Sequence, residues 1–452
     1  MNLDSTLSQP LTIHRIRCIH IIRDETRSQK RYVIAFGLLL NLLIINDLIR
    51  MLFGSSSSIA IVQYLTYGIV LLFSVIYFLK SQQIKSKQAI TASLAILLVL
   101  ILLSIFILRD YKFISSQYFP VLLSRCLPGF LLIMLIDGSL ANKLVKNLNK
   151  YRFLWIVYAV VGTIFISRNT VEWGQYAGNF GFNLLLPFCL CFYNFLRTVR
   201  DLQLTKKSLR ERRKTLVGEI IKWVLYSILI LGFIVLRGSR TALLCSAFFV
   251  LISFFFSGIV SKKIRRIIFV ILLVLVVFST VLLRPLAIML ASMFTSSRTL
   301  QLLLSGFSFN SGRTEIKQIF IQGINEDLFA FKGLFSDRYY YASHTNTILD
   351  MTSYPHNFFI EVLYQFGVVF GFVFFLLLFV LTFRSLRILS NKRFRNFDLS
   401  FLFMFFFVSG VLRLLFSSSY LTTYEFFMFV GLGLKINILA SQRFVKIKRI
   451  RA

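Results

Sequence analysis

The chain has 452 residues, of which 57% are hydrophobic and 51 are Phe, and its mean hydropathy is +0.76. A soluble core needs far fewer apolar residues, so this composition excludes an ordinary soluble domain and indicates that most of the chain faces lipid. In a soluble protein the net charge of +33 would indicate nucleic acid, but here the basic residues lie in clusters between long apolar runs. No nucleic-acid partner is therefore expected.

The chain order predicts a basic tail followed by membrane-spanning helices. Residues 1–31 contain several arginines but no apolar core of signal-peptide length, so they are interpreted as a cytoplasmic tail. A spanning helix needs roughly 20 mostly apolar residues, and the apolar runs here have that length. The fold class is therefore an all-α polytopic membrane protein of about twelve transmembrane helices. The predicted spans are 32–47, 59–79, 89–108, 118–136, 153–166, 180–196, 220–236, 241–260, 267–283, 358–383, 399–412 and 426–439.

The distribution of Lys and Arg orients these spans. Most of the 51 basic residues fall in the tail 1–31, in alternate connections and in the C-terminal tail 441–452. Because basic residues are retained on the cytoplasmic side of bacterial inner membranes, both termini are predicted to be cytoplasmic. The chain then divides into transmembrane helices 1–9 (32–283), a large periplasmic loop (284–357) and transmembrane helices 10–12 (358–440).

The large loop is expected to be partly helical and to lie on the membrane surface. Ser311 is a candidate N-cap, and Ile316, Ile319, Phe320 and Ile324 follow it with the spacing of one helix face. Loops of this length in compact proteins usually carry function.

The sequence gives no indication of a cofactor. Each of the five cysteines lies in the tail or inside an apolar run, so no disulfide framework is expected. No cluster of His, Asp and Glu with metal-ligand spacing occurs in the predicted outer connections. No metal and no other cofactor are therefore expected.

A short basic hairpin is the first candidate for function. The residues Arg237-Gly238-Ser239-Arg240 join the seventh and eighth spans on the predicted outer face. Two guanidiniums there would reach phosphate oxygens in the headgroup layer, beside the positive dipole end of the next helix. The alternative is that both arginines only anchor helix ends among lipid phosphates.

Histidine placement gives the second candidate. His14 and His20 lie in the tail, whereas His344 and His356 lie in the large loop, so a neutral-pH base on the outer side must be one of the latter two. His356 follows Pro355 immediately before the tenth span. A cap or interface role at a helix start is the alternative reading.

Three further arginines are candidates for substrate binding. Arg313 opens the helix predicted in the large loop, and Arg338 lies further along the same loop. Arg125 lies about two turns below the outer end of the fourth span, where it faces either the bundle interior or the interface by snorkelling.

The order of these motifs resembles one family of bacterial envelope glycosyltransferases. The hairpin with Ser239 and Arg240, the segment with Gly312 and Arg313, and Pro355-His356-Asn357 followed by Glu361 occur in this order over roughly residues 232–373. Together with the number of spans, they are similar to the O-antigen polymerase and O-antigen ligase superfamily.

The resemblance implies a fold similar to the GT-C helical membrane glycosyltransferases. It implies metal-independent, inverting transfer of glycan from undecaprenyl diphosphate to a sugar hydroxyl at the periplasmic face. By this resemblance Arg240 and His356 are the catalytic candidates. The substrate-binding candidates are Arg237, Arg313, Arg125, Arg338 and Glu361. The implied partners are the lipid-linked oligosaccharide, membrane lipids and a chain-length regulator protein.

Three functions are carried forward. A polymerase that extends O-antigen or capsular polysaccharide is favoured, because no match to ligase is visible outside the shared motifs. A ligase that transfers polymer to lipid A-core is the alternative within the family. A lipid-linked sugar flippase or secondary transporter is the alternative from another class, although the long loop lies at an unusual place for a carrier.

Overall fold

In a computed structural model of the chain, every element of the described part is a helix. The structure describes residues 9–53, 57–168, 174–205, 210–237, 240–257, 312–350, 353–391, 394 and 396–451. The first half of the chain contributes α1 (Gln9–Phe53), α2 (Ser57–Lys80), α3 (Ile84–Leu108), α4 (Tyr111–Phe113), η1 (Ile114–Tyr118), α5 (Phe119–Val121), η2 (Leu122–Cys126), α6 (Leu127–Met134), α7 (Gly138–Leu148), η3 (Asn149–Tyr151), α8 (Arg152–Arg168), α9 (Gly174–Asn183) and α10 (Leu185–Leu204). The second half contributes α11 (Arg210–Arg237), α12 (Arg240–Ser257), α16 (Gly312–Glu326), α17 (Ser336–Thr345), α18 (Phe358–Ser390), α19 (Phe397–Phe407), η4 (Val408–Leu412), η5 (Arg413–Leu415) and α20 (Tyr424–Arg451).

The helices confirm the all-α polytopic architecture. Eight helices of the described residues are long and apolar enough to cross a membrane. The predicted second and eighth spans correspond to shorter apolar stretches, and α8 takes the place of the fifth. The predicted ninth span, 267–283, lies outside the described residues. The eight helices are Ser28–Phe53, Ile84–Leu108, Tyr111–Met134, Asn179–Leu204, Arg210–Leu236, Phe358–Ser390, Phe397–Leu415 and Tyr424–Gln442.

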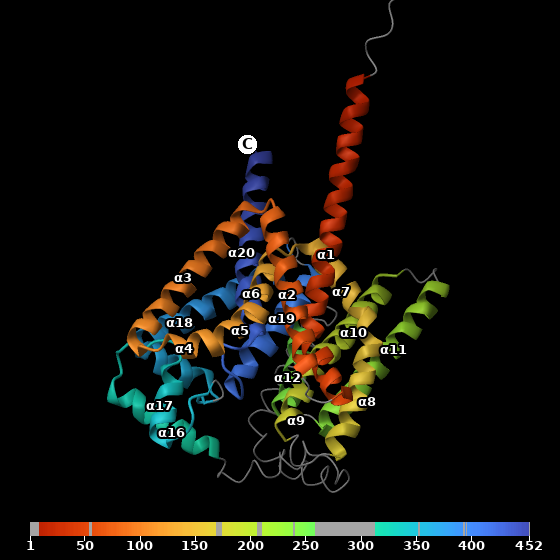
Figure 1. The fold of residues 1–452 in the computed structure, drawn as a ribbon. Helices are drawn as coiled ribbons and strands as arrows, with labels where there is room; N and C mark the ends of the chain where they lie inside the picture. Colours follow the sequence, from red (N-terminus) through yellow and green to blue (C-terminus); the bar gives the residue numbers. More distant parts are fainter. Residues whose placement is uncertain are drawn as a thin grey trace, which may run out of the picture.

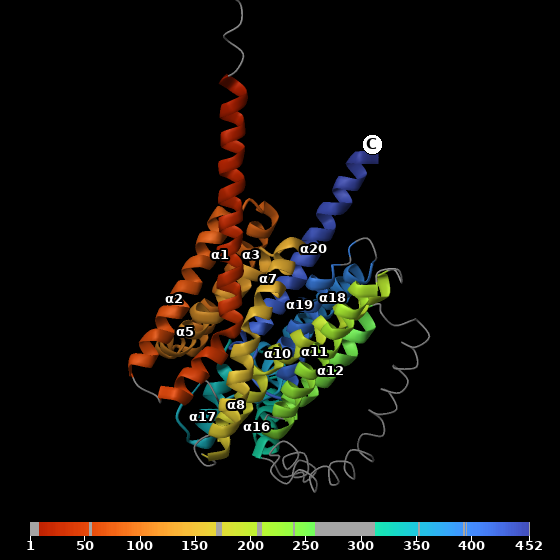
Figure 2. The same ribbon diagram turned by 90° about the vertical axis from the view of Figure 1, so that its right-hand side faces the viewer.

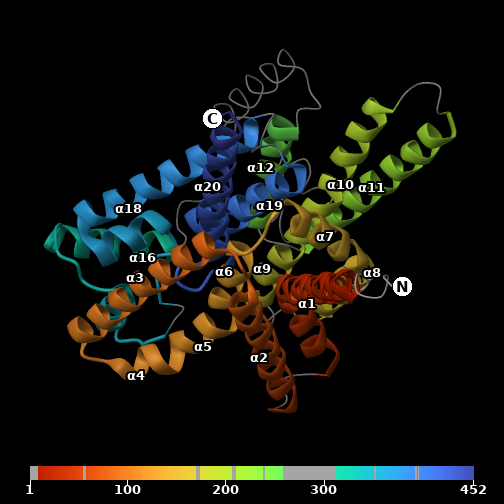
Figure 3. The same ribbon diagram turned by 90° about the horizontal axis from the view of Figure 1, so that it is seen from above.

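The bundle has a buried centre and apolar outer helices. Helices α6, α19 and α20 lie centrally, with α3 and α18 on one side and α10 and α11 on the other (Figure 3). Of the apolar window of Phe397–Leu415, 72% is buried, against 17% for the apolar window of α3. Helices such as α3 therefore present their apolar side chains to lipid, as the composition predicts.

Both ends of the chain extend from one end of the bundle, and the loop helices lie at the other. The start of α1 and the end of α20 project together, whereas α16 and α17 lie at the opposite end (Figures 1 and 2). We call this opposite end the loop end. That the loop end is periplasmic stays a prediction.

Three elements differ from the spans that the sequence predicts. Helix α1 continues upstream through much of the predicted tail, because the polar residues there do not interrupt the helical backbone. The predicted fourth span, 118–136, is a broken run from Tyr111 to Met134 that contains the π-helical segments η1 and η2. Helix α7, between the fourth span and α8, is a short amphipathic helix whose apolar face is buried.

The amphipathic helix predicted in the large loop is present as α16. Phe320 is buried against the bundle, while Ile316, Ile319 and Ile324 are half-buried and most intervening residues are exposed. The expected N-cap, Ser311, lies outside the described residues.

The loop crosses a break in α18 and satisfies the backbone groups that the break frees. Gly367 interrupts the helix with φ +71 and ψ 171. The N–H of Val368 donates to the carbonyl of Leu328 at 2.7 Å, and the N–H of Lys332 donates to the carbonyl of Gln365 at 3.0 Å. Because an unpaired backbone group in or near lipid is costly, segment 328–332 and the break stabilise each other.

Replacing Gly367 with Ala should therefore destabilise the protein. A Cβ atom there would lie 2.9 Å from the carbonyl oxygens of Ala330 and Phe329, and φ is positive. The backbone strain alone costs on the order of 1–3 kcal/mol. The measurement is the loss of helical circular dichroism during SDS unfolding. Gly68→Ala is the control, since a Cβ at Gly68 meets nothing within 4 Å; equal stability of the two variants would contradict the account.

Candidate active site

His356 lies in a fixed turn immediately before α18. Asn357 caps the helix, since its Oδ1 accepts from the N–H groups of Phe359 at 3.0 Å and Ile360 at 3.2 Å. The backbone of His356 has φ +52, in the left-handed region, after Pro355. The ring of His356 packs on the ring of Tyr354, with 4.2 Å between centroids. The surroundings of this turn therefore hold the imidazole in place.

The single-turn helix η5 (Arg413–Leu415) links this turn to the basic hairpin. It packs against both α12 and α18. On the α18 side, Asn357 Nδ2 donates to the carbonyl of Leu415 at 3.5 Å. The chain around η5 is therefore the place where the two regions meet.

On the α12 side, the register brings the start of the helix to the level of Arg413. Helix α12 runs antiparallel to α19 and η4, and the thiol of Cys245 lies 3.7 Å from the carbonyl oxygen of Val408. Arg240 lies five residues before Cys245, and Arg413 lies five residues after Val408. In antiparallel helices these two offsets lead to the same level. The structure thus places the backbone of Arg240 and the turn of His356 at one end of the bundle, on two sides of η5.

Arg413 is a basic residue of this region that the sequence analysis did not select. Its Nε donates to Ser418 Oγ at 3.0 Å, and its Nη1 lies 3.7 Å from Glu425 Oε1. Its Cζ lies 3.9 Å from the ring centroid of Phe182. Gly410 permits this arrangement, because a Cβ there would lie 2.5 Å from the backbone of Glu425.

A small pocket opens beside Arg413. Asn183, in its wall, donates to Asp47 Oδ2 at 2.6 Å, and Tyr158 donates to the same oxygen at 3.1 Å. The pocket is therefore lined by both apolar and polar side chains. The lining residues are Leu40, Leu43, Ile44, Phe182, Asn183, Leu185, Leu186, Phe405, Ser409, Arg413, Tyr424 and Glu425.

Arg125 points into the bundle rather than snorkelling to the interface. It lies in η2, with its Cζ 5.6 Å from the ring centroid of Tyr67 and near enough to Glu425 to act on it electrostatically. Its Nε is buried without a hydrogen-bond partner. Such an arginine matches the expectation of a residue that faces the interior, while its role in substrate binding stays a prediction.

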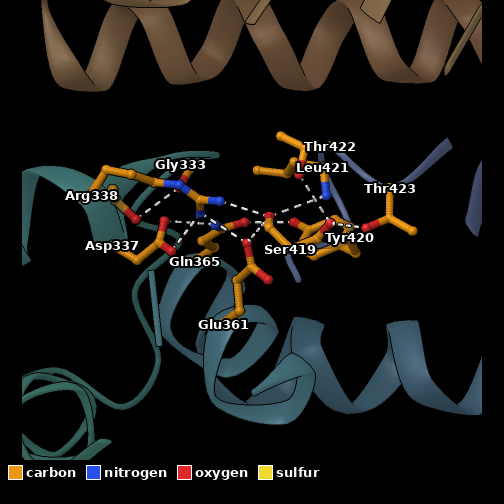
Figure 4. Close-up of polar contacts among 11 residues, drawn as sticks. Gly333, Asp337, Arg338, Glu361, Gln365, Ser419, Tyr420, Leu421, Thr422 and Thr423 are labelled. Carbon is orange, nitrogen blue, oxygen red and sulfur yellow. Dashed lines mark hydrogen bonds and ion pairs between the residues drawn. The ribbon is translucent and has the colours of Figure 1, made fainter. Parts of the chain in front are cut away.

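The two remaining described candidates, Arg338 and Glu361, form a buried ion pair (Figure 4). Arg338 Nη1 lies 2.8 Å from Glu361 Oε1 and 2.5 Å from Asp337 Oδ2, and all three side chains are 0% exposed. Arg338 Nη2 donates to Ser419 Oγ at 2.6 Å, and Ser419 in turn donates to Glu361. Burial lowers the pKa of Arg338, but the carboxylates of Asp337 and Glu361 outweigh it and raise that pKa, so the guanidinium is charged.

Gln365 and Tyr420 extend this network. Gln365 Nε2 donates to Asp337 Oδ1 at 2.7 Å, and the hydroxyl of Tyr420 donates to Gln365 Oε1 at 2.5 Å. The network therefore joins the start of α17, the first turns of α18 and the turn before α20. We refer to Asp337, Arg338, Glu361, Gln365, Ser419 and Tyr420 as the buried network.

The other candidates are placed only by their backbone. Arg237 is the last residue of α11, Arg240 is the first of α12, and Arg313 is the second of α16. Their side chains lie outside what the structure describes. Their roles stay predictions.

Sequence reasoning missed Arg413, Glu425 and Asp47. Asp47 is the last residue of a predicted span, and Arg413 and Glu425 directly adjoin two others. Charged groups at the margins of apolar runs are costly, so these positions were the signal that could have found them. Asp337 and Ser419 gave no comparable signal, because their importance comes from contacts with Arg338 that only the fold creates.

The fold and the site together define a helical polytopic membrane protein with a buried network of charged side chains near its loop end. Residues 225–376, about a third of the chain, match the family model described as O-antigen ligase. This match confirms the resemblance to the O-antigen polymerase and ligase superfamily, and it covers the second half of α11, then α12, α16, α17 and the first part of α18. No curated protein and no solved structure matches the chain. Within the described residues, no group of three or more His, Cys, Asp or Glu side chains is arranged to hold a metal ion.

Arg338→Met should destabilise the protein strongly. The substitution leaves Asp337 and Glu361 buried without their counter-charge, which typically costs about 3–5 kcal/mol. The free energy of unfolding in an SDS titration measures the loss. Arg387→Met on exposed helix surface is the matched control and should change stability by less than about 0.5 kcal/mol. A loss in Arg338→Met no larger than in this control would show that the network contributes little.

Proposed function

We propose that the chain is a glycosyltransferase that joins lipid-linked repeat units into O-antigen or capsular polysaccharide at the periplasmic face of a bacterial inner membrane. The observation that carries the proposal is the position of η5, which touches both α12, beginning at Arg240, and α18, preceded by His356. Both regions lie inside the part of the chain that matches the O-antigen ligase family.

The proposed donor is a glycan on undecaprenyl diphosphate. Arg240, with Arg413 at the same level, binds the diphosphate. Arg237 on the same hairpin adds a further phosphate contact. Guanidiniums suit this task because they bind phosphate oxygens in a bidentate way and stay charged in a membrane environment.

In the proposed reaction, His356 accepts the proton of an acceptor hydroxyl. The hydroxyl oxygen attacks the anomeric carbon, and the bond from that carbon to the diphosphate oxygen breaks with inversion. The lipid diphosphate leaves with the electron pair, and the arginines stabilise the negative charge that develops on it. This charge stabilisation is the reason we propose a metal-independent reaction.

The described geometry changes what we propose for Arg338 and Glu361. Both side chains are 0% exposed and bind each other, so we assign them a positioning role instead of direct substrate binding. Arg125 and Arg313 remain proposed contacts for substrate, the first from the bundle interior and the second from α16.

An assay with purified protein in lipid vesicles tests the proposed function. Polymerase activity predicts that lipid-linked repeat units grow into a ladder of longer chains, and the metal-independent mechanism predicts that growth continues with a chelator present. Supplying lipid A-core as acceptor tests the ligase alternative. Transfer of preformed polymer to lipid A-core without chain growth would replace the polymerase by the ligase, and absence of both activities would contradict the proposal.

Arg240→Ala should abolish glycan transfer while leaving membrane insertion intact. Loss of one donor to a developing negative charge typically lowers the rate by about 100- to 1000-fold. Arg240→Lys should recover little of it, because an ammonium cannot replace the bidentate fork. Chain growth by each variant, at equal protein in the membrane, is the measurement. Growth of normal length and rate by Arg240→Ala would remove this residue from the mechanism.

His356→Ala should also abolish transfer, whereas His344→Ala should not. General base catalysis typically contributes about 100- to 10,000-fold. His344 is a matched control because it is the other described histidine of the same loop, it is exposed, and it lies at the end of α17. Initial rates of chain growth distinguish the two variants. Equal loss in both variants, or in neither, would contradict the assignment of His356 as the base.

A further inference from the structure

We propose that Tyr354 and Arg338 are positioning residues that hold the imidazole of His356 in its reactive orientation. This inference rests on the proposed function, since it gives His356 its role as the base. It adds two residues whose effect on the reaction passes through His356 and not through contact with substrate.

Tyr354 lies between the buried network and His356. The Cζ of Arg338 lies 5.3 Å from the ring centroid of Tyr354, within the range of a cation–π interaction. The ring of His356 lies 4.2 Å from the same ring, centroid to centroid. The ring of Tyr354 therefore contacts both the buried guanidinium of Arg338 and the imidazole of His356, whose ring is tilted by 50° against it.

The outer side of Tyr354 is also fixed. The backbone of Ser418 makes a hydrogen bond to Tyr354, and Ser418 Oγ accepts from Arg413. The neighbouring Ser419 belongs to the buried network. The turn before α20 thus holds Tyr354 from one side while Arg338 holds it from another.

The side chain of Arg338 is itself held rigidly, so it can fix the position of the Tyr354 ring. Its side chain is 0% exposed, and it binds Asp337, Glu361 and Ser419. These partners come from α17, α18 and the turn before α20, so the guanidinium cannot move without displacing three segments. A group with no access to solvent also has no direct path to a substrate phosphate.

His356 needs such support because its own backbone does not favour the observed conformation. A non-glycine residue at φ +52 persists only where the surroundings determine it. Asn357 fixes the position of the turn by capping α18 through its Oδ1. The ring of Tyr354 contacts the imidazole, and we assign to this contact a part in orienting it.

Steady-state kinetics of purified protein with lipid-linked repeat units test the proposal. Tyr354→Phe keeps the ring and should retain kcat within about twofold, whereas Tyr354→Leu should lower kcat by about 10- to 100-fold, the cost of a small misplacement. KM for the lipid-linked donor should stay within about twofold in both Tyr354 variants, because we propose no contact between Tyr354 and the donor. Arg338→Lys, which keeps the charge but not the planar guanidinium, should lower kcat in the same manner. Tyr341→Leu is the control, since Tyr341 stacks on Phe320, with ring centroids 6.1 Å apart.

The outcomes separate this inference from the proposed function. The positioning role is supported if kcat falls in Tyr354→Leu and does not fall in Tyr354→Phe. Equal kcat in wild type and Tyr354→Leu, with His356→Ala inactive, overturns the positioning role and leaves the proposed function standing. Equal losses in Tyr354→Leu and Tyr341→Leu overturn it as well, because the effect would then be one of general stability. Activity in His356→Ala, or none in the wild type, contradicts the proposed function itself.

Discussion

A single buried guanidinium determines how the loop end of this protein is assembled. Arg338 binds its neighbour Asp337 in α17, Glu361 in α18 and Ser419 in the turn before α20, without access to solvent. A buried charge is tolerated only when it is paired and hydrogen-bonded, so the three segments must adopt one arrangement for any of them to be stable. The turn that carries His356 and the chain that carries Arg413 are both placed by this arrangement.

The membrane environment imposes a second constraint on the same region. A break in α18 at Gly367 frees backbone groups, and the loop segment 328–332 satisfies them. The loop is thereby fixed to α18 at two points, by backbone hydrogen bonds at the break and by the ion pair of Arg338 with Glu361. A loop held in this way can support catalytic side chains with the precision that rigid helices provide.

The sequence predicted much of this organisation, for reasons that can be stated for individual elements. The helical periodicity of α16 and the motif around His356 are local signals, and local signals survive in the structure. Pro120 and Pro128 are a local signal for the broken run around η1 and η2 that the prediction of a continuous span did not use. Gly367 alone is a weaker signal, so the break in α18 was not predicted either. The partnership of Arg338 with Ser419, and the approach of Arg413 to the level of Arg240, depend on tertiary packing that a pattern along the chain does not encode.

The account depends on the basic hairpin and the turn of His356 serving one substrate together. Cryo-electron microscopy of the protein in lipid nanodiscs with an undecaprenyl diphosphate-linked sugar would test this most directly. The account predicts density for the diphosphate between the start of α12 and η5, with the first sugar on the side of His356. Density for the diphosphate elsewhere in the bundle, with the space around η5 empty, would contradict it.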